Sequence, residues 1–561
     1  MFALKAKTIT ASDLKLLLRL LHPYVPDLPL DPRTLRRTPR DCIKVTLRNG
    51  VYVHIGLRTS ILSLLNSYQV DITVPWTLQL NIDGLRVHDY PGTEMWPILG
   101  RITKPIISQP FVIGSFSGRG KPEPLDHFLQ AFIDEMEDAL KNGVLVNESV
   151  TIKITLQSVI CDSVARAYVR QVKSHSGYWG CDKCSQKGQR LMNHRMVFPS
   201  LNDCRRSDAT FRSRSNRPHH IGTSPFEKLP IDMVLDFPLD PMHLIYLGVV
   251  KRLLGLWRTA DRSSLVRISG SQLKQIDLRL LAAVPSLTVD FPRKCSSIFN
   301  HDRWKATECR QFLLYLGPVV LRHVLQPRVY ENFMVLSSIV YVLSHNTYSR
   351  SMLSLIRLLA NRFILQFRKL YGDNNVVYNI HCLAHICDDV HRFGALNNFS
   401  AFPFESFMKS VKTDINGPKC PAVQLRNRAE ERARGGYMHG EIKFMDDTQT
   451  ESSQSVSSLF LKLNNNFYVS PNQPENCVLY NNHPFLISAV DDKLVHARKF
   501  LQLRPLYEHA FSSSSLFIFV ASALSVNTTP IPVEYVSAKC LCFTENEEFV
   551  IIPILHTFVN P

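Results

Sequence analysis

The spacing of apolar residues predicts three consecutive strands in the first third of the chain. Residues 78–82 alternate apolar and polar side chains, the period of a half-buried strand, and this strand ends at Asp83-Gly84. Two further apolar runs, at residues 95–100 and 111–114, are separated by turns that contain Gly and Pro. The pattern therefore predicts three strands in sequence.

A helix and a fourth strand are predicted next. Residues 124–141 carry apolar side chains at three- and four-residue spacing, and Asn142-Gly143 closes this helix. Residues 150–160 form a strand pattern that runs to Asp162, and a helix begins around Ser163. Three strands, a helix and a strand, with an acid after the first and fourth strands, is the layout of a ribonuclease H-like core. We therefore predict an α/β fold with a ribonuclease H-like mixed sheet and flanking helices.

The other segments differ in character. Residues 12–21 are predicted to be helical, and the Pro- and Arg-rich residues 29–40 to form an extended basic arm, since Pro disfavours a continuous helix. The pattern divides the chain into five segments: an N-terminal basic arm and helix at 1–75, the first part of the core at 76–175, a large and mostly helical insertion at 176–375, the final helical part of the core at 376–436, and a C-terminal β-rich domain at 437–561. Within the insertion, residues 176–300 look irregular.

Composition indicates a globular protein with several cores. The 561 residues are 45% hydrophobic and 20% charged, and that length exceeds one compact core. No apolar run reaches the about 20 residues that a membrane span needs, so no membrane association is expected. The 13 cysteines are scattered through the chain, which favours reduced thiols in the cytosol or nucleus over a disulfide framework.

The charge of the chain points to a polyanionic partner. The net charge is +17, and residues 1–435 alone hold 58 Lys and Arg against 36 Asp and Glu. Basic side chains that contact phosphates release counterions, so DNA is the simplest partner, although a merely solvated basic surface stays open. A stretch with an aromatic residue and five arginines is a candidate DNA-binding loop: Arg205, Arg206, Arg212, Arg214 and Arg217. A second basic cluster spans residues 426–434.

Three acids are candidates for metal-dependent phosphoryl transfer. Two carboxylates on adjacent strands and a third acid from a later helix can hold two divalent ions, Mg²⁺ or Mn²⁺, for cutting DNA. Asp83 and Asp162 fit the strand ends, although an Asp there is also a common turn former or helix N-cap. Glu405 fits the third position, in the first turn of a helix that begins near Pro403. Glu308 and Glu430 are alternatives that look more like salt-bridge partners.

A Cys-x-x-Cys pair predicts a structural zinc site. Cys181 and Cys184 supply two of the four expected ligands, and the adjacent His219 and His220 could complete the set. His194 and His243 are less favoured, and two free thiols remain the alternative. His381 and His385 would share a helix face, but no Glu follows His381 as a metalloprotease H-E-x-x-H motif requires. We expect them to be a hydrogen-bonded structural pair near the catalytic core rather than the site of a zinc protease.

An ordered series of short strings over roughly residues 25–435 resembles transposases of the CACTA (En/Spm) superfamily, and most of all the transposase domain-containing proteins of animal genomes. The strings are LNIDGL at 80–85, MWPILG at 95–100, ICDSVARA at 160–167, GYWGCDKC at 177–184, LDPMHLIYLGV at 239–249, WKATE at 304–308, YNIH at 378–381 and FPFESFMK at 402–409. The β-rich tail also looks like these animal proteins.

The resemblance implies a DDE transposase that acts on DNA in the nucleus, with a second copy of the chain as a possible further partner. Asp83, Asp162 and Glu405 would be its three acids, with catalytic Mg²⁺ or Mn²⁺. Cys181 and Cys184 match the family's C-x-x-C, and Asp240 and His243 match its Asp–His motif. No separate zinc finger or helix-turn-helix is visible ahead of residue 76. The rival expectation is therefore a catalytically inactive relic that binds DNA or protein, and a scaffold built around the β-rich tail is a third.

Overall fold

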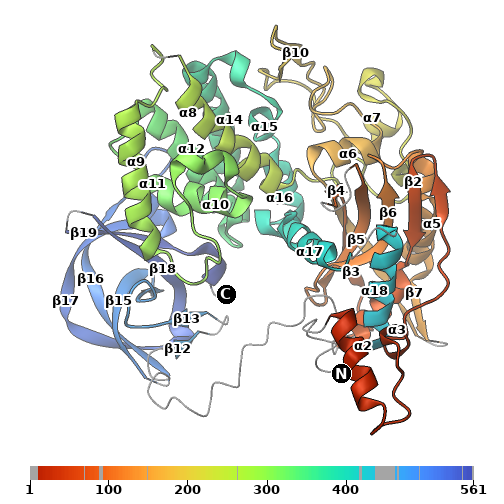
Figure 1. Cartoon of the computed structure of the whole chain (residues 1–561). Coiled ribbons are helices and arrows are strands. Elements are labelled where there is room, and N and C mark those ends of the chain that lie inside the picture. Colours follow the sequence, from red (N-terminus) through yellow and green to blue (C-terminus); the bar gives the residue numbers. More distant parts are fainter. Residues whose placement is uncertain are drawn as a thin grey trace. The chain divides into compact units, whose positions relative to one another are not determined.

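The chain folds into two compact units that interleave along the sequence. The computed structural model describes residues 10–67, 70–87, 92–147, 150–261, 263–415, 420–435, 461–463, 467–491, 493–545 and 547–558. The first unit is built from residues 1–187, 204–240 and 399–445, and the second from 188–203, 241–398 and 446–561. Among the described helices, none combines the length and the apolar character that crossing a bilayer demands. The protein is a mixed α/β protein with a β-rich C-terminal region (Figure 1).

A mixed sheet forms the centre of the first unit. Its strand order is β1-β2-β6-β5-β3-β9. The short strand β4 pairs with the first residues of β5, on the edge that β5 shares with β3. β3 and β9 are parallel, and the other neighbours are antiparallel. The strands are β1 Val45–Leu47, β2 Gly50–His54, β3 Trp76–Ile82, β4 Leu85–Arg86, β5 Glu94–Lys104, β6 Phe111–Gly118 and β9 Ile154–Ile160. The strands predicted at residues 78–82, 95–100 and 111–114 are confirmed as β3, β5 and β6, whereas β1 and β2 come from a segment predicted to be an arm and a helix.

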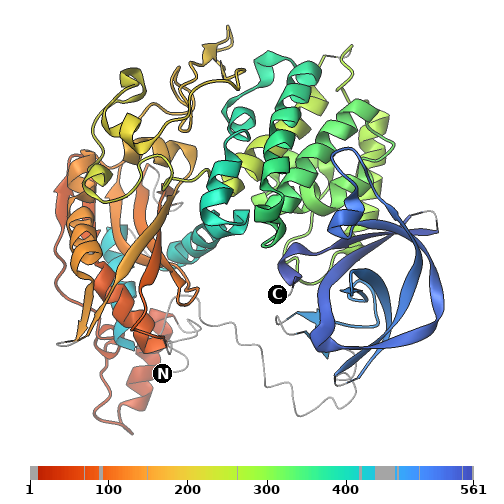
Figure 2. The same ribbon diagram turned by 180° about the vertical axis from the view of Figure 1, so that it is seen from behind.

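Helices pack on both faces of this sheet because its strands are apolar on both sides. The ring centroids of Phe116 in β6 and Phe128 in α5 lie 6.2 Å apart. Ser117, the residue after Phe116, contacts Cys420 and Ala422 at the start of α18. Successive strand residues point to opposite faces, so α5 and α18 cover opposite faces (Figures 1 and 2). The helices of this unit are α2 Ala11–Leu21, α3 Pro32–Leu35, α4 Leu57–Ser67, α5 Leu125–Asn142, α6 Ser163–Arg170, α7 Asp208–Arg212, α17 Phe402–Thr413 and α18 Pro421–Gly435.

Local sequence signals explain where most of these elements begin and end. The predicted helix over residues 124–141 is α5, which ends at Gly143 with φ 81°, a backbone conformation that glycine adopts without strain. The strand predicted over residues 150–160 is split at Lys153 into β8 Val150–Ile152, which pairs with β7 Val144–Asn147, and β9. The predicted extended arm contains the short helix α3, because Asp31 caps it and Pro32 takes its first position.

The second unit contains a helical body. Its main helices are the π-helix η3 Met242–Val250, α8 Lys251–Thr259, α9 Gly270–Ala283, α10 Ala306–Gln311, α12 Pro327–Ser344, α14 Leu353–Tyr371, α15 Tyr378–Cys382 and α16 Ile386–Phe393. The prediction of irregular structure over residues 176–300 is therefore wrong for η3, α8 and α9. η3 has apolar residues on every side and is almost entirely buried, so it lacks the polar–apolar period that reveals an amphipathic helix.

The C-terminal region of the same unit is a closed antiparallel barrel, which agrees with the predicted β-rich domain. Its strand order is β14-β15-β16-β17-β19-β18, and β18 pairs back with β14. The strands are β14 Cys477–Tyr480, β15 His483–Val490, β16 Leu494–Pro505, β17 Phe519–Pro532, β18 Val536–Glu545 and β19 Glu548–Pro553. The predicted boundary at residues 436–437 and the first part of this domain, up to residue 460, lie outside the described residues.

A buried lysine joins the barrel to the helical body. The Nζ atom of Lys539 in β18 lies 2.7 Å from Oδ2 of Asp290, which follows α9, and it also pairs with Glu475. Lys539 is 0% exposed, and both carboxylates are nearly as deeply buried. Further bonds support this junction: the hydroxyl of Tyr341 in α12 donates to the carbonyl of Pro553 at 2.8 Å. The barrel is thus fixed to the helices by buried polar groups that satisfy one another.

Replacing this lysine tests the junction. Lys539→Met leaves two buried carboxylates without their cation, so we expect the free energy of unfolding to fall by about 3–5 kcal/mol. Urea unfolding followed by circular dichroism measures the change. Lys493→Met, at an exposed position of the same barrel, is the matched control and should change stability by less than about 0.5 kcal/mol. Equal midpoints for the two variants would contradict this account of the junction.

Candidate active site and metal centre

The parallel pairing of β3 and β9 brings two of the predicted acids to one edge of the sheet. Asn81 in β3 lies opposite Ile160 in β9, and the Asn81 side-chain amide donates to the Ile160 carbonyl at 2.8 Å. Two residues further along each strand are Asp83 and Asp162. Because the strands run in the same direction, both acids leave the sheet at the same edge.

Each of these two aspartates is oriented by a backbone amide. The Gly84 N–H donates to Oδ1 of Asp83 at 2.7 Å, and the Ala165 N–H donates to Oδ1 of Asp162 at 2.6 Å. Asp162 is therefore the N-cap of α6, which was one of the two interpretations of that residue. Burial first, with smaller contributions from both carboxylates, raises the pKa of the neighbouring Cys161 thiol to about 12.

Glu405 lies in the first turn of α17, as the sequence predicts. The start of this helix is held by Asp240, a residue only 2% exposed, whose Oδ1 accepts the Ala401 N–H at 2.8 Å. The Glu405 N–H in turn donates to the Ala401 carbonyl at 2.9 Å, and Phe404 is fully buried beside it. Asp240 thus positions the helix that carries Glu405, which gives the first half of the Asp–His motif a structural role.

His243, the second half of that motif, belongs to a group of possible metal ligands with two of the acids. One ligand atom from each of Asp83, His243 and Glu405 lies within 4.8 Å of the others, and all three residues are partly buried. Asp162 is not a member of this group. From the sequence, His243 is a less favoured zinc candidate and, with Asp240, a match to the Asp–His motif, which by itself assigns it no role at the acids.

The Cys-x-x-Cys loop is held by a buried ion triad. Asp182, between the two cysteines, pairs with Arg166 at 2.9 Å and with Arg170 at 2.8 Å, and these side chains are 0–3% exposed. Both arginines come from α6, whose N-cap is Asp162. The Lys183 Nζ donates to the carbonyl of Val234 at 3.0 Å. The two residues between the cysteines therefore anchor the loop and leave the thiols to face elsewhere.

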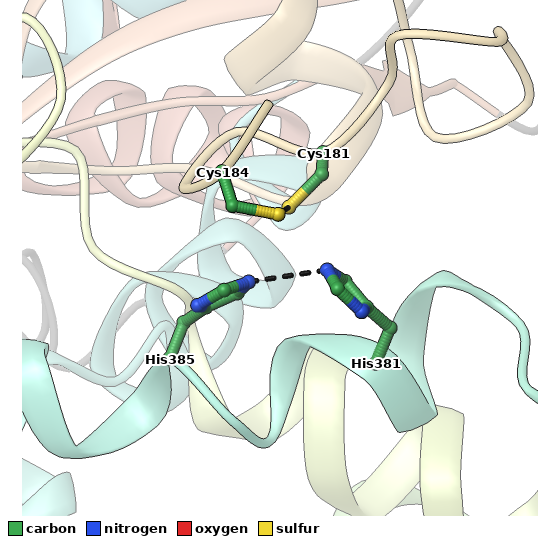
Figure 3. Close-up of side chains that lie close together, drawn as sticks. All are labelled: Cys181, Cys184, His381 and His385. Carbon is green, nitrogen blue, oxygen red and sulfur yellow. Dashed lines mark hydrogen bonds between the residues drawn. The ribbon is translucent and has the colours of Figure 1, made fainter. Parts of the chain in front are cut away.

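Four buried side chains form the second group of possible metal ligands. The sulfurs of Cys181 and Cys184 lie 3.5 Å apart, and the Nε2 atoms of His381 and His385 lie 3.1 Å apart. The two histidines are 1% and 2% exposed, and they are the hydrogen-bonded pair that the sequence predicts. One sulfur or nitrogen from each of the four residues lies within 4.8 Å of the others (Figure 3). Two thiols and two imidazoles are a donor set that fits Zn²⁺.

The predicted zinc ligands His219 and His220 are not in that group, so the expected ligand set needs correction. Nδ1 of His219 lies 2.7 Å from the Trp179 carbonyl, and the ring of His220 packs on Phe211 at 4.6 Å. Burial, with nearby arginines second, lowers the pKa of His219 to about 3 and that of His220 to about 4. Both rings serve the packing around the Cys-x-x-Cys loop. His194 is exposed and has a positive φ of 61°.

Arginines of the candidate DNA-binding loop are engaged within the protein. Arg206 donates to the Cys181 carbonyl at 3.0 Å, Arg212 binds Asp208 through Nε at 2.8 and 2.9 Å, and Arg214 pairs with Glu227 at 2.7 Å. Arg205 and Arg217 are exposed. The loop therefore uses arginines to support its own fold.

The alternative acids and the second basic cluster pair with each other or with neighbours, as expected for salt-bridge partners. Glu430 pairs with Arg426 at 2.5 Å and with Arg434 at 3.1 Å. Glu308 lies 3.8 Å from Arg293 and accepts the Lys305 N–H at 2.9 Å.

Comparison with known proteins bears on the C-terminal region. Residues 449–554, which include all the strands of the barrel, match the Domain of unknown function DUF8592. No curated protein matches the chain.

Substituting Asp182 tests how the Cys-x-x-Cys loop is held. Asp182→Asn leaves two buried guanidinium groups without a carboxylate, so we expect a loss of about 3–5 kcal/mol in the free energy of unfolding. Thermal unfolding measures the change. Glu548→Gln removes a similar but exposed contact with Arg504 and should cost less than about 1 kcal/mol. An Asp182→Asn protein as stable as this control would show that the ion triad does not hold the loop.

Proposed function

We propose that this protein is a transposon-derived DDE-type transposase that binds DNA and cuts and joins its strands with divalent metal ions, in the nucleus. The observation that carries the proposal is the group formed by Asp83, His243 and Glu405, with Asp162 at the end of the strand next to Asp83. These acids come from three distant parts of the sequence. Their gathering at one sheet edge supports a functional site rather than three separate helix caps or turns.

The topology supports a ribonuclease H-like core. In the order β6-β5-β3-β9, the strands β3, β5 and β6 follow one another in sequence and pair antiparallel. β9, which comes after helix α5, pairs parallel with β3, the first of the three. This is the arrangement that the element order predicts for such a core. The helical body between α6 and α17 then corresponds to the expected insertion.

The donor set at the sheet edge fits Mg²⁺ or Mn²⁺. Carboxylate oxygens that are partly open to solvent suit hard cations, which keep several waters. When bound, such ions stabilise the attacking and leaving oxygens of a phosphoryl transfer. Asp83 and Glu405 would hold the ions, with the position of Glu405 set by Asp240 through the start of α17. His243 supplies a nitrogen that can bind an ion or donate a hydrogen bond to a phosphate oxygen.

The group of Cys181, Cys184, His381 and His385 would hold a structural Zn²⁺. Bonds of about 2.3 Å to sulfur and about 2.05 Å to nitrogen in a tetrahedral site separate two sulfurs by about 3.8 Å and two nitrogens by about 3.3 Å. The observed separations of 3.5 and 3.1 Å are slightly shorter than these values. All four residues are buried, as in a closed structural site. The ion would fix the Cys-x-x-Cys loop that Asp182 anchors to α6.

A catalytically inactive, DNA-binding relic is the second candidate. The observation that favours it is the position of Asp162, which caps α6 and is not in the group with Asp83 and Glu405. Such a protein would keep the fold, the zinc and the positive charge.

Strand cleavage tests the first candidate against the second. With Mg²⁺ or Mn²⁺ and labelled DNA, we expect Asp83→Asn and Glu405→Gln to lower the rate at least about a hundredfold, because each removes about 3 kcal/mol or more of charge stabilisation. Asp126→Asn, at an exposed position of α5, is the control. Unchanged rates in both variants would end the two-metal proposal. DNA binding without any cleavage by the wild type would support the relic.

Metal analysis separates the two possible zinc ligand sets. We expect about one zinc per chain in the wild type, and loss of zinc in Cys181→Ser and His381→Asn, because a four-ligand site loses most of its affinity with one ligand. His219→Asn should keep its zinc. Inductively coupled plasma mass spectrometry gives the stoichiometry. Retention of zinc by His381→Asn together with loss by His219→Asn would restore the ligand set predicted from the sequence.

A further inference from the structure

Two arginines of the second unit converge on one neutral oxygen. Arg252, the second residue of α8, donates from Nη2 to Oδ1 of Asn375 at 2.5 Å. Arg195, just before β11 Met196–Val197, donates from Nη1 to the same oxygen at 3.4 Å. The Asn375 side-chain amide donates to the Tyr371 carbonyl at 2.6 Å, which turns its oxygen toward the arginines. The three residues come from separate segments of the chain and form a hydrogen-bonded, partly exposed cluster.

Within the described part of the chain, no carboxylate lies within 4.0 Å of Arg195 or Arg252 to neutralise this pair of charges. Other arginines of the same unit do have acidic partners. Arg368, for example, binds both oxygens of Asp373 at 2.9 Å. Burial first, and then the charge of Arg195, lowers the pKa of Arg252 to about 10. The Nε atom of Arg252 is also buried without a hydrogen-bond partner.

Two close guanidinium groups match the chemistry of a phosphate group. The planar guanidinium forks bind phosphate oxygens in pairs, and one phosphate can accept from two arginines at once. A bound oxyanion would remove the repulsion between the two charges and accept hydrogen bonds from both guanidinium groups. The excess of positive charge over residues 1–435 favours a polyanion as its source.

We propose that Arg195, Arg252 and Asn375 form a phosphate-binding site that holds the backbone of a nucleic acid strand. This inference rests on the proposed DNA-binding function and names residues that would carry it outside the candidate active site. It also explains how the protein contacts DNA when Arg206, Arg212 and Arg214 are engaged in its own fold.

Salt-dependent DNA binding by the full chain tests the proposal. Fluorescence anisotropy with a labelled duplex, at several NaCl concentrations, compares the wild type with a double variant, Arg195→Gln with Arg252→Gln. We expect the affinity to fall about tenfold and the slope of log K against log salt to fall by about 1, the contribution of one neutralised phosphate. Arg368→Gln, whose arginine is already bound by Asp373, should match the wild type. A double variant that also matches the wild type would overturn the proposal.

A substitution that adds a negative charge and keeps both arginines separates loss of DNA binding from loss of folding. Asn375→Asp places a carboxylate between the arginines, so it should remove DNA affinity as the double variant does while leaving the melting temperature at least as high as that of the wild type. The ion pairs gained with two arginines offset the lost bond to the Tyr371 carbonyl. DNA binding by Asn375→Asp equal to that of the wild type would contradict the site.

Inorganic phosphate identifies the source of the ligand. If millimolar phosphate raises the melting temperature of the wild type but not of the double variant, while both bind DNA equally, the site takes free phosphate and the backbone assignment is overturned. Loss of DNA affinity in the double variant supports it. Asp83→Asn should leave the salt slope unchanged, and the double variant should still cleave saturating DNA, so failure of this site and failure of the proposed catalysis are distinguishable.

Discussion

The candidate active site depends on the parallel pairing of β3 with β9. β3 is buried along almost its whole length, so a shift of the register by one residue would turn its apolar side chains away from their partners. The bond from the Asn81 amide to the Ile160 carbonyl ties the two strand ends together at the observed register. Asp83 and Asp162 reach the same edge of the sheet only with this pairing. The fold of the first unit therefore sets the geometry on which the proposed chemistry rests.

Helix α6 links the second acid to the Cys-x-x-Cys loop. Its first turn is capped by Asp162, and its later residues Arg166 and Arg170 bind Asp182 between the cysteines. A buried ion triad contributes little net stability compared with an apolar core, because three charged groups lose their hydration. What it provides here is orientation: the helix, the acid at its start and the cysteine loop cannot move independently. Asp240 has the same role for Glu405 at the start of α17.

Sequence reasoning succeeded where the determining signal is local. The alternation in β3, the amphipathic period of α5 and the Cys-x-x-Cys spacing lie within short windows, and each predicted element is present. It failed where the partner lies far along the chain. Nothing near Cys184 indicates His381 as a ligand. His219 and His220, which follow each other and lie nearer in the sequence, are the more obvious choice. β1 and β2 are too short for a clear period. The pairing of Arg212 with Asp208 could have been predicted from the sequence, because oppositely charged residues four apart on a helix face each other.

The central claim is that acids from distant parts of the chain hold divalent cations at the edge of the sheet. Crystals of the protein soaked in Mn²⁺ and measured for anomalous scattering test it directly. The account predicts an anomalous peak from a manganese ion bound by the carboxylates of Asp83 and Glu405. A fully soaked crystal with no manganese at these carboxylates, or with manganese bound only elsewhere, would contradict it.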